Sequence, residues 1–144
     1  MSEFAAALRG SAVLYPAVEC AHMVGGGLLL GAIVAMDLRL LGLGRTLAVA
    51  PLSRLLLPVA ITGLALAVVS GALLFATDWQ SYLDNRAVWA KTALLVVGFV
   101  NLALLHARQW PRLVRENVTA PLAASLSLFT WIGVMIAGRL IAYM

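Results

Sequence analysis

The sequence predicts an all-α fold, an integral membrane bundle of four helices that run up-down-up-down. Hydrophobic residues make up 63% of the 144 residues, and charged residues only 11%. Soluble domains are about 45–50% apolar and about 25% charged, so a soluble core of this length could not bury all these apolar side chains. We therefore expect a lipid bilayer as the surroundings of the chain. Short connections between the apolar runs favour antiparallel neighbours.

Four apolar runs are each long enough to cross a bilayer, which takes about 20 helical residues. We expect helices over about residues 12–42, 52–77, 88–107 and 121–143, in a single transmembrane domain that covers residues 1–144. No stretch between these runs has the composition of a linker or of a second domain.

Local signals mark the ends of the expected helices. Glycines up to Gly44 close the first run. Pro51 and Ser53 form a helix-start pattern, a proline with a serine cap, before the second run. The fourth run starts at Pro121.

Small residues predict where the helices meet. Gly25-Gly-Gly27 and Gly31 line the first run, and Gly63, Ser70 and Thr77 recur at every seventh position along one face of the second. In lipid, small residues let helix backbones approach closely. The alternative is that the glycines make room for a flat cofactor.

The net charge of +4 comes from basic residues near the ends of the apolar runs. This placement is typical of membrane topology, so we expect no nucleic-acid partner. Because the bacterial inner membrane keeps its more basic loops inside, the side called face A is expected in the cytoplasm and both termini in the periplasm. Face A carries six arginines, whereas the opposite face B carries four basic residues mixed with Glu3, Asp78 and Asp84. The six are Arg39, Arg45, Arg54, Arg108, Arg112 and Arg115, and the four are Arg9, Arg86, Lys91 and Arg139.

Five polar residues from four helices fall at one depth of the bundle. Counted from face A at about 1.5 Å per residue, they lie within about three residues of one another, or about 5 Å. Ionisable groups at membrane depth are costly, and each suggests a functional site. The five are Glu19, His22, Ser70, Lys91 and Arg139.

Helical angle indicates which of these side chains share a face. At about 100° per residue, Glu19, His22 and Gly26 fall on one stripe of the first helix, and Lys91 and Gly98 share a stripe of the third. A polar group at this depth must face the interior of the bundle. We therefore expect His22 and Lys91 to face each other across a space beside these glycines.

The second histidine, His106, cannot share a metal with His22 within one chain. The two differ in depth by about 13 residues, or about 20 Å. Two axial nitrogens of one iron lie only about 4 Å apart, twice a metal–nitrogen bond of about 2 Å. We expect His106 to be a solvated histidine at the face A interface, with Asp37, Arg39 and Arg108.

Three interpretations of the polar cluster remain open. One is a buried polar network without a cofactor, in which Glu19 pairs with Arg139 or Lys91 and His22 donates to a backbone carbonyl. Another is a heme site, with His22 as the axial ligand and metal-binding residue, Glu19 as the acceptor for its other ring nitrogen, and Gly26 and Gly98 beside the cofactor. In that site Lys91 and Arg139 pair with propionates, or Lys91 ligates the iron as a free amine.

Copper is the third interpretation, because thiol, thioether and imidazole groups suit it. Cys20, Met23 and Met135 lie near His22 in depth. However, Cys20 points about 160° away from His22 on a helix, and no Met-x-x-Met array exists.

The sequence resembles the small four-helix bacterial protoporphyrinogen oxidases of the HemJ type. The shared pattern is His22, Gly31 and Arg39 in the first helix and Trp89-Ala-Lys91-Thr in the third, which ends in His106. The resemblance implies heme b held at His22 and Lys91, and an oxidoreductase that passes electrons to quinone. Two positions depart from the pattern: Asp37 precedes the arginine, and Ala90 stands where that family usually has a histidine.

Other segments resemble two further groups of membrane proteins. The glycine-rich first helix, Ser70-Gly71 and the segment from Lys91 to Asn101 are similar to CopD-type copper-resistance membrane domains. Asp37-Leu-Arg-Leu-Leu-Gly42 and Phe75-Ala resemble an uncharacterised family of four-helix bacterial membrane proteins.

These observations together predict a membrane redox protein that binds heme b. Electron transfer alone and quinone-linked porphyrinogen oxidation both remain open, with quinone or another redox protein as partner. Glycine-lined faces favour a homo-oligomer. The alternatives are a cofactor-free accessory subunit and a copper-handling protein.

Overall fold

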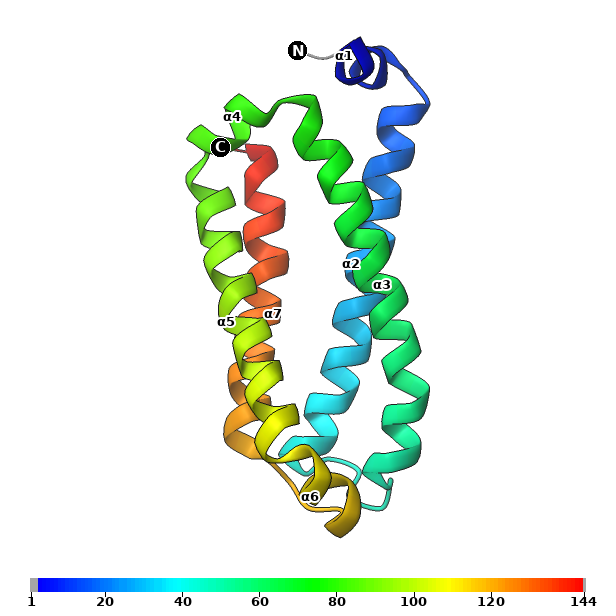
Figure 1. The fold of residues 1–144 in the computed structure, drawn as a ribbon, viewed down its shortest axis with the longest axis vertical. Coiled ribbons are helices and arrows are strands. Elements are labelled where there is room, and N and C mark those ends of the chain that lie inside the picture. The colour runs from blue at the N-terminus through cyan, green and yellow to red at the C-terminus, as the bar shows by residue number, and fades with distance from the viewer. Residues whose placement is uncertain (1–2, 144) are drawn as a thin grey trace.

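The computed structural model describes residues 3–143, and the prediction of an all-α membrane bundle is confirmed (Figure 1). Residues 1, 2 and 144 of the expected domain lie outside the described part. Within residues 3–143 there is no strand. Four helices are long: α2 (Leu14–Leu41), α3 (Val49–Thr77), α5 (Arg86–Arg108) and α7 (Pro121–Leu140). The others are short: α1 (Glu3–Gly10), α4 (Trp79–Asp84), α6 (Trp110–Glu116) and the 3₁₀ turn η1 (Ile141–Tyr143).

The long helices expose their apolar side chains to the surroundings of the bundle. Leu122 is 87% exposed and Phe129 is 81% exposed. All four long helices have the length and apolar composition to cross a membrane. Only a lipid environment accommodates helices that are apolar on their outer face, so the chain is a multi-pass membrane protein.

The ends of α2 and α3 show how the sequence sets the helix bounds. Gly42 ends α2 with a φ of 109°, and its N–H donates to the carbonyl of Arg39. Helix α3 begins at Val49, three residues before the expected start, because Pro51 falls in its first turn, where a missing N–H costs nothing. Ser53 does not cap α3 as expected, and its hydroxyl donates to the carbonyl of Ala50 at 2.8 Å.

The bundle consists of two antiparallel pairs, α2 with α3 and α5 with α7 (Figure 1). Helices α2 and α7 make the main contact between the two pairs. The short helix α4 connects α3 to α5 at one end, and α6 connects α5 to α7 at the other, where it also contacts α3. Helices α1 and α4 lie at one end of the bundle, the face B end, and α6 lies at the other, the face A end.

The closest approach of two helices is a glycine contact between α2 and α3. A Cβ added to Gly25 would lie 2.6 Å from the backbone N of Ala67 and 2.8 Å from the carbonyl oxygen of Gly63. A Cβ on Gly63 would lie 2.6 Å from the backbone N of Leu29. The backbones therefore touch at this crossing, and Gly63, Ser70 and Thr77 are all buried.

One buried arginine ties the loops together at the face A end. Arg39 is only 2% exposed, so at this end of the bundle it is buried among the loops instead of being solvated. Its Nε donates to the carbonyl of Leu47 at 2.6 Å, and its Nη2 donates to Oδ1 of Asn117 at 2.9 Å. The same Oδ1 accepts the N–H of Val49 at 2.9 Å. Asn117 has a φ of 54°, a left-handed conformation that asparagine tolerates better than most residues.

Candidate functional site

His22 lies against α3 in an orientation that leaves one ring nitrogen available. Its Nδ1 is 2.9 Å from the carbonyl oxygen of Ala67 and 3.2 Å from Oγ of Ser70. A carbonyl oxygen can only accept, so the proton is assigned to Nδ1 and the lone pair to Nε2. The half-buried ring lies against Gly71, where a Cβ would be 3.0 Å from Cε1 of the imidazole. This arrangement fixes both the tautomer and the ring plane.

Lys91 of α5 meets the available nitrogen of His22 from the other helix pair. Its Nζ lies 3.5 Å from Nε2. The lysine side chain runs across α7 at Gly138, where a Cβ would lie 3.4 Å from Nζ and 3.6 Å from Cε. Among the described residues, no carboxylate forms an ion pair with Lys91. The histidine and the lysine therefore meet where depth and helical angle place them.

Gly138 is a site residue that sequence reasoning missed. It makes room for the lysine stem on the helix opposite α5. The sequence feature that could have identified it is its position next to Arg139, at the depth of the polar cluster.

The other expected site residues do not join the pair. Glu19 is exposed and forms no ion pair within the described chain. Arg139 donates to the hydroxyl of Tyr143 at 2.9 Å and lies over its ring. Both residues are near helix ends at face B, and their long side chains extend outward instead of into the bundle. The pairing of Glu19 with Lys91 or Arg139, expected for a buried network, does not form.

The two expected cofactor glycines pack against side chains. A Cβ on Gly26 would lie 3.4 Å from Sδ of Met135. A Cβ on Gly98 would lie 3.2 Å from Cγ2 of Thr130, and Gly98 is seven residues, or about 10 Å, from Lys91 along α5. Gly26 therefore contacts α7 about one turn from His22, and Gly98 belongs to the α5–α7 contact.

A cavity of about 100 Å³ lies in the other half of the bundle, at the face A end. Asp37 lines it and is only 4% exposed, so at this end of the bundle the carboxylate is buried inside the protein instead of being solvated. Its Oδ2 has no hydrogen-bond partner among the described residues. Leaving a buried polar atom unpaired costs about 1–3 kcal/mol. The carboxylate is buried because Asp37 continues the inward stripe of Ile33, which lines the same cavity.

His106 also lines this cavity and lies far from His22. It is exposed, as expected of an interfacial histidine. Its ring stacks on Trp110 with a centroid distance of 4.5 Å and an angle of 15°. Its Nδ1 lies 3.1 Å from the carbonyl oxygen of Leu102. Each histidine therefore belongs to a different half of the bundle.

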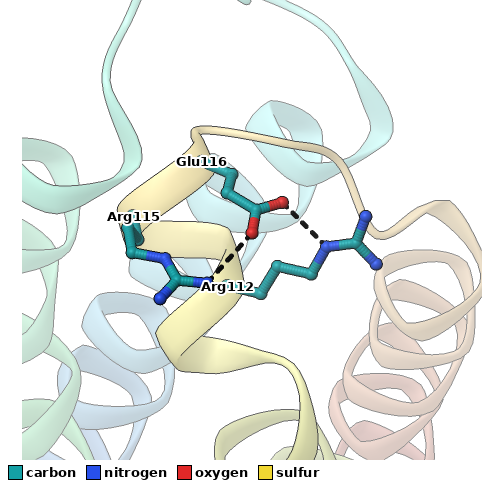
Figure 2. Close-up of polar contacts among 3 residues, drawn as sticks. All are labelled: Arg112, Arg115 and Glu116. Atoms are coloured by element: carbon teal, nitrogen blue, oxygen red, sulfur yellow. Dashed lines mark hydrogen bonds and ion pairs between the residues drawn. The ribbon is translucent and has the colours of Figure 1, made fainter.

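Ion pairs occur at both ends of the bundle, outside the spans. Arg9 of α1 pairs with Asp78, which holds the pKa of that carboxyl below its usual range and raises the pKa of the arginine. Glu116 of α6 accepts from Arg112 at 2.9 Å and from Arg115 at 3.2 Å (Figure 2). Those two arginines lower the pKa of Glu116. Exposed pairs of this kind contribute little to stability, because water and salt screen them.

The soft ligands considered for copper do not converge on His22. Cys20 is exposed, and Met23 is 67% exposed. Over the described residues, no three His, Cys, Asp or Glu side chains are grouped closely enough to hold a metal ion.

Comparisons with protein-family models, with curated proteins and with solved structures found no match for this chain. The geometry of the His22–Lys91 pair and of the face A cavity is therefore the basis for assigning a function.

Proposed function

We propose that the protein is a heme b-binding redox protein of the bacterial inner membrane, with His22 and Lys91 as the two axial ligands. One observation carries the proposal: Nε2 of His22 keeps its lone pair and lies 3.5 Å from Nζ of Lys91. The two nitrogens come from opposite helix pairs, so a flat group between them would be held by both pairs.

The separation of these nitrogens is close to what an iron between them requires. Two metal–nitrogen bonds of about 2 Å span about 4 Å, which is about 0.5 Å more than the observed distance. The donors suit iron because neutral imidazole is a common axial ligand, and lysine ligates as a free amine.

The ligand role for Lys91 is favoured over pairing with a propionate. A lysine that serves as a counter-ion is best placed at a wet edge, whereas Lys91 is half-buried against Gly138 and next to the imidazole. No carboxylate in the described chain holds it in its charged form. A neutral amine needs no such partner.

Bound heme would supply one-electron transfer, and the chain would control its position and surroundings. Ala67 and Ser70 hold the imidazole, Gly71 lets it lie flat on α3, and Gly138 positions the lysine. Among the functions left open by the sequence, electron transfer to quinone or to another redox protein needs nothing more than these residues. Porphyrinogen oxidation would need a further substrate site.

A homo-oligomer is part of the proposal. Gly27 and Gly31 are exposed on α2 and spaced four residues apart, with open space where a Cβ would lie. Small residues at this spacing let transmembrane helices of two copies pack closely.

The absorbance spectrum of the purified protein tests the function. We expect protein from heme-replete cells to show a Soret band, with sharp b-type bands after reduction by dithionite. Lys91→Arg should change these bands, because guanidinium stays protonated and cannot ligate iron. Colourless wild-type protein would contradict heme binding. Unchanged spectra in both Lys91→Arg and Lys91→Ala, at full heme occupancy, would remove Lys91 from the ligand set.

The charges at the bundle ends support a topology with both termini in the periplasm. Five exposed arginines surround the α6 end, two of them paired with Glu116, whereas the exposed arginines at the other end are three: Arg9, paired with Asp78, and Arg86 and Arg139. By the positive-inside rule the α6 end lies in the cytoplasm. A reporter fused after Met144 should therefore be active as a periplasmic enzyme, and one fused within the loop at residues 42–48 as a cytoplasmic one. If the fusion after Met144 were active as a cytoplasmic enzyme and the loop fusion as a periplasmic one, the bundle would have the opposite orientation in the membrane. The five arginines are Arg45, Arg54, Arg108, Arg112 and Arg115.

A further inference from the structure

The face A cavity contains a buried hydrogen-bond acceptor that the described chain leaves without a donor. Asp37 is 4% exposed, lines the cavity and has no partner for Oδ2. Ser127, which also lines the cavity, interacts with this carboxylate. Arg39 bonds through Nε and Nη2 to Leu47 and Asn117, while its own buried Nη1 has no partner among the described residues. A buried carboxylate oxygen without a hydrogen bond is unfavourable, so we expect a hydrogen-bond donor from another molecule to occupy this position.

A second acceptor lies on α5, across the cavity lining from α2. Nδ1 of His106 contacts the carbonyl of Leu102, so the proton is assigned to Nδ1 and Nε2 keeps its lone pair. No described residue bonds to this Nε2. Stacking on Trp110 at 4.5 Å sets the plane of the imidazole. The cavity therefore combines two acceptors from different helices.

The remaining walls are mostly apolar, although Ser53, Asn101 and Ser127 also line the cavity, and they come from both helix pairs. Leu56 and Leu57 of α3 and Leu102 and Leu105 of α5 contribute to them. Leu57 is 52% exposed and Leu102 is 41% exposed, so the cavity borders the lipid-facing surface of these helices. A ligand that enters from the bilayer, with an apolar body and hydrogen-bond donors, matches this lining.

We propose that this cavity binds the headgroup of a lipid-soluble quinol, with one hydroxyl donating to Asp37 and the other to His106. The volume of about 100 Å³ is of the order that a single six-membered ring needs, since an apolar cavity of about 150 Å³ takes up benzene. A bare metal cation would find mostly hydrocarbon around it. The choice of a quinol among lipid-soluble hydrogen-bond donors rests on the redox function proposed above. That the cavity binds a hydrogen-bond donor does not rest on that function.

The cavity is a different site from the proposed axial ligands. Asp37 follows His22 by 15 residues on α2, which is about 22 Å of helix. Loss of heme and loss of quinol binding can therefore be produced separately.

Calorimetric titration with decylubiquinol tests the site. The detergent-purified protein is kept under anaerobic conditions so that the quinol stays reduced. We expect one molecule bound per chain, and an affinity about ten-fold weaker or worse in Asp37→Asn, because a charge-assisted hydrogen bond becomes a neutral one. The variant should fold, since Oδ2 has no partner to lose. His106→Phe, which can keep the stacking on Trp110 but has no acceptor, should also weaken binding.

Asp84→Asn is the matched control, because Asp84 is an exposed carboxylate on α4 at the opposite end. It should bind decylubiquinol as the wild type does. Equal affinity in wild type, Asp37→Asn and His106→Phe would overturn the proposal. Binding of sodium or tetraethylammonium in place of the quinol, abolished in Asp37→Asn, would overturn it too. Quinol binding that persists in His22→Ala supports this site whether or not the wild type contains heme.

Discussion

The variant His22→Ala should lose most of its heme, with a heme-to-protein ratio lowered roughly ten-fold or more. Alanine removes the only imidazole that lies beside Lys91 and leaves Ala67 and Ser70 with nothing to orient. The ratio is measured from the Soret absorbance and the protein content of samples purified from the same cells.

His106→Ala is the matched control for this experiment. It removes the other histidine of the chain, which lies on the face A cavity and stacks on Trp110. It should keep its heme, although its quinol binding should fall. Equal heme loss in the two variants would contradict the separation of the two sites.

The second large effect is expected at the crossing of α2 and α3. Gly25→Ala should lower the free energy of unfolding by about 1–3 kcal/mol, the usual cost of forcing an extra carbon into a packed interior. The added Cβ would meet backbone atoms of Ala67 and Gly63 at less than 3 Å, and backbone cannot rotate away as a side chain can. Thermal unfolding in detergent, followed by circular dichroism, measures the change.

Gly31→Ala lies on the same helix and provides the control when it is measured on monomeric protein in detergent, because Gly31 belongs to the face proposed above to pack between two copies. No atom lies within 4 Å of its added Cβ. Because alanine favours helix over glycine by about 1 kcal/mol, this variant should unfold at the same temperature as the wild type or higher. If both alanine variants unfolded at the same temperature, the contact at Gly25 would not hold α2 and α3 together.

The sequence predicts the four-helix membrane bundle well because the signal is averaged over long apolar runs. It also brings His22 and Lys91 together, since depth along a straight helix is fixed by the rise per residue. Neither of these signals predicts the short helices α1, α4 and α6. They are too short for a bilayer-length signal, and they form at the bundle ends where polar and apolar residues mix.

Individual polar side chains near helix ends are harder to predict. Asp37 and Arg39 look like interfacial charges because they close an apolar run, yet both are buried. The loop around Asn117, which is distant in sequence, buries Arg39, whereas Asp37 is buried among the helices that line the cavity. Glu19 and Arg139 show the opposite error, since both are expected in the interior and both are exposed. A long side chain one or two turns from the end of a helix can reach the outside. Helical angle alone does not distinguish these cases.

The bonds of Arg39 also set an order of events while the chain is being made. They join residues 78 positions apart, so the guanidinium has no Asn117 to bind until α5 and α6 have been synthesised. The Gly25–Gly63 contact, by contrast, is complete as soon as α3 has emerged. Synthesis from the N-terminus therefore yields a paired α2–α3 hairpin first, in which Arg39 can bond to Leu47 of the adjoining loop but not yet to Asn117. Arrival of Asn117 then fastens the start of α3, through Val49, and the end of α2 in a single step.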